Sequence, residues 1–142
     1  MMRFIDLVVV HCSATKEGKD FDVEDVRRWH KERGFTDVGY HAVIKLDGRV
    51  QNGRPLGEAG AHARGFNSRS LGICYIGGVG ADGKAKDTRT DAQREALERT
   101  LREWRRWHPK ARIRGHRDLG APKDCPSFDV ASWCRSIGLD PL

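Results

Sequence analysis

The chain has 142 residues, a hydrophobic content of 38% and a formal net charge of +6. A chain of this length can bury a core without disulfide support, and none of its apolar runs approaches the ~20 residues of a membrane span. We therefore predict one domain over residues 1–142, a monomer with no membrane segment. The positive charge favours an anionic partner, and nucleic acid, acidic lipid and bacterial cell-wall polymers all qualify.

The hydrophobic pattern predicts strands and helices that alternate along the chain. Residues 4–10 are almost continuously apolar, which indicates a strand buried on both faces, with His11 at its carboxyl end. Asp47-Gly48 is a hairpin signal, and Thr90 to Gln93 reads as a capping box. The predicted elements are a strand over 4–10, a helix between Asp22 and Gly34, strands over 39–46 and 49–52, a long loop over 53–70, a strand over 71–76, a helix over 91–107, a strand over 111–114 and a short helix over 129–137.

Interleaved strands and helices favour an α/β fold, in which helices flank both faces of a central mixed sheet. His11 and His116 both fall at the carboxyl ends of predicted strands. Because sites in open α/β sheets lie at that edge, we expect the two histidines to share a site.

The first apolar run does not resemble an export signal. It is interrupted by Asp6, and His11-Cys12-Ser13 after it is a poor small-residue cleavage site. We therefore expect the protein to be made in the cytoplasm without a signal peptide.

Residues 115–129 concentrate groups suited to metal chemistry: an imidazole at His116, an ammonium at Lys123 and a thiol at Cys125. His11 is the candidate third metal ligand. Three protein ligands leave the fourth position of a tetrahedral zinc open, which is typical of catalytic zinc, whereas structural zinc takes four closely spaced ligands. From spacing alone, the alternative that the three residues are unrelated stays open.

Two other patterns suggest chemistry but lack the context for it. Residues 78–83 match the GxGxxG pattern, yet the next helix begins only at residue 91, so a surface loop is the better interpretation. The arginines of the helix over 91–107 alternate with acidic residues, and no nucleic-acid-binding motif accompanies them. We do not expect nucleic acid to be the main partner.

Four segments, in this order, resemble the zinc-dependent type 2 N-acetylmuramoyl-L-alanine amidases. They are His-Cys-Ser-Ala-Thr-Lys at 11–16, Gly-Tyr-His at 39–41, Ala-His-Ala-Arg-Gly-Phe-Asn at 61–67 and Pro-Lys-Asp-Cys-Pro-Ser-Phe-Asp at 122–129. The similarity runs from residue 5 to about residue 138 and is strongest to the small lysozymes of T-odd phages. Peptidoglycan recognition proteins share the fold of this family.

The resemblance implies a Zn²⁺ site formed by His11, His116 and Cys125, with Tyr40 and Lys123 as catalytic residues. Relatives that only recognise peptidoglycan usually lose the cysteine ligand, so its presence favours an enzyme. Lys123 could face the developing oxyanion, and Tyr40 could orient the water or relay a proton. Strand alternation would turn Tyr40 toward the core, so it must lie at the start of its strand, where that face opens into the site. If Tyr40 is buried, packing is its alternative role.

His62 and Asn67 match positions that line the cleft in this family. The resemblance makes them predicted substrate contacts. Stabilisation of a turn is the alternative role, because asparagine and glycine dominate turns.

The family cleaves the amide between the lactyl group of N-acetylmuramic acid and the first L-alanine of the stem peptide. The resemblance therefore implies a peptidoglycan hydrolase whose partner is the anionic cell wall. Without an export signal, such an enzyme would act on the wall after release, as a phage or prophage endolysin does. The open alternatives are a non-catalytic peptidoglycan-binding module, a cytoplasmic muropeptide-recycling amidase and a cysteine hydrolase that uses Cys125 as its nucleophile.

Overall fold

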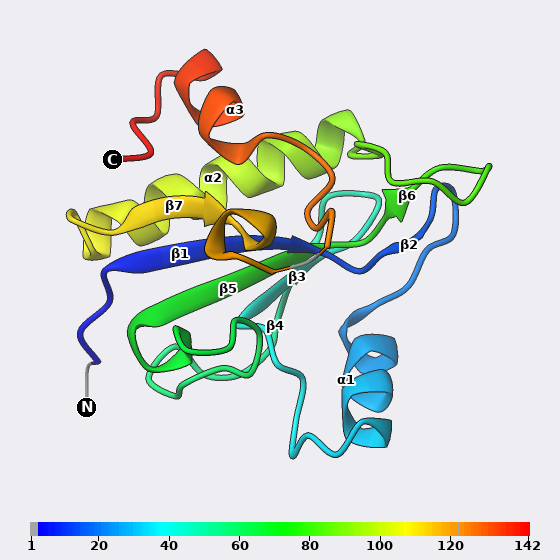
Figure 1. Ribbon diagram of the computed structural model, residues 1–142, viewed down its shortest axis with the longest axis horizontal. Coiled ribbons are helices and arrows are strands. Elements are labelled where there is room, and N and C mark those ends of the chain that lie inside the picture. Colours follow the sequence, from blue (N-terminus) through cyan, green and yellow to red (C-terminus); the bar gives the residue numbers. More distant parts are fainter. Residues whose placement is uncertain (1–2, 122) are drawn as a thin grey trace.

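The apolar segments pair into a five-stranded mixed sheet (Figure 1). The structure is a computed structural model that describes residues 3–121 and 123–142. In the order β4-β3-β5-β1-β7, β3 and β4 are antiparallel and the other neighbouring pairs are parallel. The strands are β1 (Leu7–Cys12), β3 (Ala42–Ile44), β4 (Val50–Asn52), β5 (Ser70–Tyr75) and β7 (Arg112–Gly115).

Polar side chains fix where the two longer helices begin. Asp22 accepts a hydrogen bond from the Asp25 backbone N–H at the start of α1 (Val23–Glu32), and the Asp25 side chain caps Asp22 in return. Thr90 and Gln93 form the same reciprocal box at the start of α2 (Asp91–Trp107). The predicted bounds of α2 are confirmed. The third helix, α3 (Val130–Ser136), is also close to its prediction.

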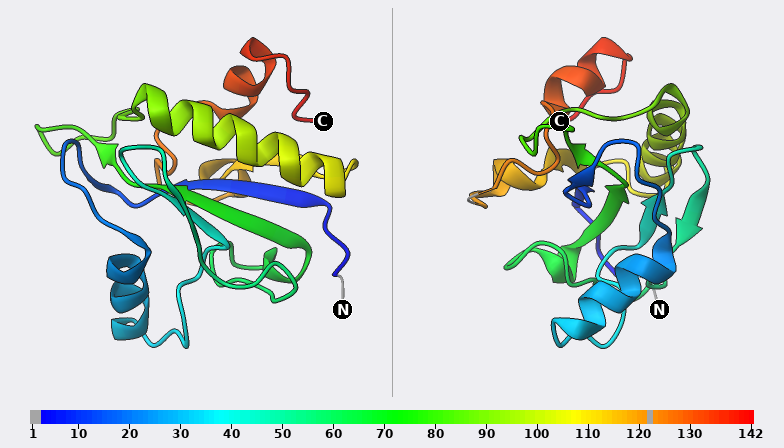
Figure 2. Two further views of the ribbon diagram at one scale, coloured as in Figure 1. Left: turned by 180° about the vertical axis from the view of Figure 1, so that it is seen from behind. Right: turned by 90° about the vertical axis from the view of Figure 1, so that its right-hand side faces the viewer.

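Helices cover both faces of the sheet, as expected from the alternating pattern (Figures 1 and 2). On one face, Val8 and Val10 of β1 belong to the large core formed with α2 and α3. Alternate β1 residues, such as Val9, face the other side, where the chain over residues 53–69 packs on them. Helix α1 lies on that second side and buries Val23 and Val26 against Val43 of β3.

The structure differs from the predicted elements in several places. The strand predicted over 4–10 is β1, Leu7–Cys12, so His11 is its second-last residue. The predicted strand over 39–46 is shorter, because the backbone bends over 39–41 and regular pairing begins only at Ala42. Two short strands not foreseen in the sequence, β2 (Thr15–Lys16) and β6 (Gly78–Val79), form a separate parallel pair. The GxGxxG segment therefore begins as a strand and continues as a turn, with no helix at its end.

None of the helices over residues 3–121 and 123–142 has the length and apolarity needed to cross a membrane.

Candidate metal centre

The register of the sheet brings the two predicted histidine ligands together. In the parallel pairing of β1 with β7, Val10 lies opposite Gly115. The next residues along the chain are His11, in β1, and His116, directly after the end of β7. Their ring centroids are 4.5 Å apart. The two histidines lie together because neighbouring parallel strands end at the same edge of the sheet.

Cys125 arrives on the segment that follows β7, and several hydrogen bonds hold it there. The Arg117 backbone N–H donates to the carbonyl oxygen of Cys125 (2.8 Å). The Tyr75 hydroxyl donates to the carbonyl oxygen of Pro126 (2.6 Å), and the Ser127 hydroxyl donates to that of Gly78 (2.8 Å). These bonds join the Cys125 segment to the turn after β7, to β5 and to β6.

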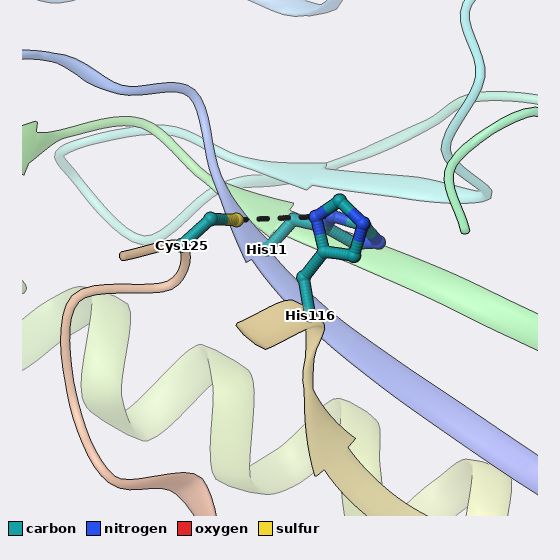
Figure 3. A group of neighbouring side chains, drawn as sticks. All are labelled: His11, His116 and Cys125. Carbon is teal, nitrogen blue, oxygen red and sulfur yellow. Dashed lines mark hydrogen bonds between the residues drawn. The ribbon is translucent and has the colours of Figure 1, made fainter. Parts of the chain in front are cut away.

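The three candidate ligands point toward one another from three separate segments (Figure 3). One ligand atom from each of His11, His116 and Cys125 lies within 4.8 Å of the other two. Cys125 Sγ is 3.8 Å from His11 Nδ1. Bond lengths of about 2.0–2.3 Å at tetrahedral angles would separate these two atoms by ~3.6 Å, so the spacing suits a zinc ion.

Burial keeps both histidines neutral, which is the form that can bind a metal. His11 is 1% exposed. Its pKa is lowered well below the ordinary value, chiefly by burial and then by the neighbouring His62. The pKa of His116 is also lowered, chiefly by burial and then by the charge of Lys123.

The Cys125 thiol has a raised pKa in the metal-free protein, because it shares a hydrogen bond with the Cys12 thiol and is largely buried. A bound cation reverses that preference and favours the thiolate. The backbone N–H of Cys12 points at Cys125 Sγ (3.2 Å) and would stabilise negative charge there. Two imidazoles and a thiol are the borderline-soft donors that zinc takes, so the set fits this metal.

Tyr40 lies beside the ligands. Its ring centroid is 4.9 Å from that of His11 and 5.2 Å from that of His30. Because the backbone bends before β3, Tyr40 packs with Val38 and Val43 and not with the core under α2. It lies just before its strand, and its catalytic role stays a prediction. Burial raises the pKa of its phenol well above the ordinary value, so the hydroxyl stays protonated.

The candidate ligands form part of the wall of a cleft of about 650 Å³. Lys123 is an exposed residue of that wall. Arg33 and Arg64 also line it, and no aspartate or glutamate is found among its described lining residues. The cleft is therefore suited to an anionic ligand. A larger hollow of about 940 Å³, between the β3–β4 hairpin and α2, contains none of the predicted site residues.

His62 and Asn67 also line the cleft, and both make internal hydrogen bonds. Asn67 Oδ1 accepts from the backbone N–H groups of His62 and Ala63 (2.9 Å each), which is a turn-stabilising role. His62 Nδ1 lies 2.9 Å from His11 Nε2. The contact of His62 and Asn67 with substrate stays a prediction.

The sequence patterns did not single out Ser70 or Cys12 for this site. Ser70 Oγ is 3.2 Å from His62 Nε2, and Cys12 lies against the candidate ligand Cys125. Strand alternation could have found Ser70, because Ser70, Gly72 and Cys74 share the face of β5 opposite its core residues. The contact of Cys12 with Cys125 depends on where the segment that carries Cys125 packs, so no local sequence signal predicts it.

An α/β fold with two histidines and a cysteine gathered in a cleft defines a protein with a candidate catalytic metal site. The family profile described as N-acetylmuramoyl-L-alanine amidase matches residues 1–128. This chain therefore belongs to the N-acetylmuramoyl-L-alanine amidase family. The expected family and hydrolase class are confirmed.

Curated relatives agree with that assignment. The chain is 47% identical over 127 residues to the endolysin of Enterobacteria phage K11, a match that covers 89% of this chain and 83% of the relative. It is 44% identical over 128 residues to the endolysin of Escherichia phage T7, covering 90% and 84%. The solved amidase LysC from Clostridium intestinale has the same fold, with a TM-score of 0.82 and 24% identity over 97% of this chain and 88% of that one.

Proposed function

We propose that this protein is a zinc-dependent endolysin that hydrolyses the amide between N-acetylmuramic acid and the L-alanine of the stem peptide. The observation that carries the proposal is the convergence of His11, His116 and Cys125, within 4.8 Å of one another, in a cleft that also contains Lys123. The close match to phage endolysins along most of the chain supports it.

His11, His116 and Cys125 would hold the zinc ion. When bound, zinc supplies Lewis-acid chemistry and lowers the pKa of a water molecule in the open position toward neutrality. The three ligands line a cleft, and three protein ligands are the number that a catalytic zinc takes, whereas a structural zinc takes four. The buried neutral state of His11 prepares it to bind the metal without first losing a proton.

Lys123 and Tyr40 would act directly on the reacting amide. Attack on the carbonyl carbon places negative charge on its oxygen, and the Lys123 ammonium in the cleft wall can stabilise that charge. The protonated Tyr40 phenol is a hydrogen-bond donor beside the ligands and can orient the attacking water or relay a proton. No aspartate or glutamate is present among the described lining residues, so we assign the role of general base to no carboxylate of the cleft.

The charge of the cleft fits the substrate class. Arg33, Arg64 and Lys123 line it, and stem peptides and cell walls carry carboxylates. Complementary charge of this kind raises the local substrate concentration and is screened by salt. A protein made in the cytoplasm would reach the wall only after release, which is how a phage or prophage lysis enzyme would work.

Zinc analysis combined with cell-wall lysis tests the proposal. The purified protein should hold one zinc per chain and clear a suspension of purified cell walls, and a strong chelator should abolish clearing until zinc is restored. Cys125→Ser should lose both properties. Clearing that survives chelation but is abolished by thiol alkylation would indicate a cysteine hydrolase instead. Binding to walls without clearing, in the zinc-loaded protein, would indicate a recognition module.

A further inference from the structure

His62 is a buried histidine with both ring nitrogens engaged. Its Nδ1 lies 2.9 Å from Nε2 of His11, and its Nε2 lies 3.2 Å from the hydroxyl oxygen of Ser70. The side chain is 9% exposed, so water can reach little of it. The three side chains form a continuous hydrogen-bonded row from the candidate ligand into the sheet.

The two nitrogens of His11 have separate neighbours. Nδ1 faces Cys125 Sγ at 3.8 Å, and Nε2 faces His62. A neutral imidazole carries one proton, on one nitrogen only. If Nδ1 is to bind a metal, that proton must be on Nε2, and His62 Nδ1 must then accept it.

We propose that His62 is a positioning residue that sets the tautomer and orientation of His11. In this arrangement His11 Nε2–H donates to His62 Nδ1, and His62 Nε2–H donates to Ser70 Oγ. The inference rests on the proposed metal function. An outer partner of this kind fixes the ring of a ligating histidine and raises its basicity.

The surroundings of His62 are shaped to hold its ring in this place. A Cβ atom added to Gly72 of β5 would lie 2.6–2.7 Å from the ring atoms of His62, so the ring occupies space that only glycine leaves. Asn67 Oδ1 binds the His62 backbone N–H (2.9 Å) and so fixes the loop that carries it. The ring therefore has little freedom to turn away from His11.

In the competing arrangement, the hydrogen bonds between Ser70, His62 and His11 run in the opposite direction. Ser70 can also donate, because a hydroxyl serves as donor or acceptor. His62 would then donate from Nδ1 to His11 Nε2, and the proton of His11 would sit on Nδ1, facing Cys125. That tautomer cannot bind a metal through Nδ1. Zinc binding should therefore select the first direction, and the tautomer of His62 reports which direction is present.

Zinc affinity, measured by competition with a chromophoric chelator, tests the role of His62. His62→Phe keeps a ring but removes the acceptor, and we expect a loss of about 10- to 100-fold in affinity. His62→Asn can place its Oδ1 near the former Nδ1 and should retain most of the affinity. The matched control is His108→Asn, which changes a partly buried histidine that is not among the described residues lining the cleft, and should bind zinc like the wild type.

Nitrogen NMR of the imidazoles of the wild-type protein, with and without zinc, supplies a readout that needs no variant. In the zinc-loaded protein, His62 should carry its proton on Nε2 and none on Nδ1. A protonated His62 Nδ1 in that state, or a His62→Phe variant that folds and binds zinc as tightly as the wild type, would overturn the inference while leaving the zinc function intact. A wild-type protein that takes up no zinc would instead overturn the proposed function.

Discussion

The hydroxyl of Tyr75 donates a 2.6 Å hydrogen bond to the carbonyl oxygen of Pro126, the residue after the candidate ligand Cys125. Tyr75 is 1% exposed and belongs to the core under α2. A side chain of the central strand β5 thus holds in place a segment that reaches the site from the carboxyl-terminal part of the chain. The position of the cysteine ligand is therefore coupled to the packing of the core.

Tyr75→Phe should weaken both folding and metal binding. It leaves the Pro126 carbonyl without its partner, which costs about 1–3 kcal/mol of unfolding free energy. Because Cys125 is then held less firmly, zinc affinity should fall as well. Urea unfolding of the metal-free protein and chelator competition measure the two effects. Unchanged values for both would show that the bond contributes nothing.

Lys123→Met should lower kcat by about 10²- to 10³-fold, the typical loss when one oxyanion donor is removed. Zinc content and thermal stability should not change, because Lys123 is exposed. The matched control is Lys110→Met, which removes an exposed lysine that is not among the residues lining the cleft and should leave kcat unchanged. Equal activity of the two variants would remove Lys123 from the chemistry.

Tyr40→Phe removes only the phenolic oxygen and keeps the ring that packs beside His11. If the hydroxyl orients water or transfers a proton, kcat should fall by about 10²- to 10⁴-fold, with zinc affinity retained. Wall clearing and chelator competition on the same preparation separate these effects. A variant with wild-type kcat would leave Tyr40 with a packing role.

Acid should destabilise the metal-free protein through His41. This side chain is 2% exposed, accepts from the Gly72 N–H and bonds to the Glu58 carbonyl oxygen. Burial, aided by the cationic Arg3 and Arg54, lowers its pKa from 6.5 to about 4. The unfolded chain therefore binds the proton first, so the contribution is complete above pH 6.5 and is lost as the pH falls toward 4.

The acid effect can be assigned by a variant. A pKa difference of this size is worth up to about 3 kcal/mol. Denaturant unfolding at several pH values between 7.5 and 4 should show a steady loss of stability, with a smaller slope in His41→Asn. An identical slope in wild type and variant would assign the acid sensitivity to other groups, such as His30, whose pKa burial also lowers to about 4.

Much of the fold could be predicted because short-range sequence signals determine it. The Thr90 and Gln93 capping box marks the start of α2, and the apolar stripe of Leu97, Leu101 and Trp104 marks its buried face. The pairing of His11 with His116 followed from a general rule on where parallel strands end. Assignment of the metal ligands still required the family resemblance, because spacing alone does not show that His11 shares a site with His116 and Cys125.

Other features depend on contacts between distant segments and have no local signal. Alternation predicts Tyr40 on the core face, and only the bend before β3 turns it toward the ligands. The orientation of His62 depends on the absence of a side chain at Gly72, ten residues away, and on the Asn67 turn. These features are determined by how the backbone before β3 and the loop over residues 53–69 pack on the sheet.

Product mapping on defined peptidoglycan tests the central claim most directly. Purified walls would be digested with zinc-loaded protein, with chelated protein and with Cys125→Ser, and new amino termini would be labelled and identified. We expect new termini on L-alanine, together with free lactyl carboxyl groups on the glycan, from the zinc-loaded protein alone. New termini at another residue, new reducing sugars without L-alanine termini, or equal release after chelation would contradict a zinc-dependent N-acetylmuramoyl-L-alanine amidase.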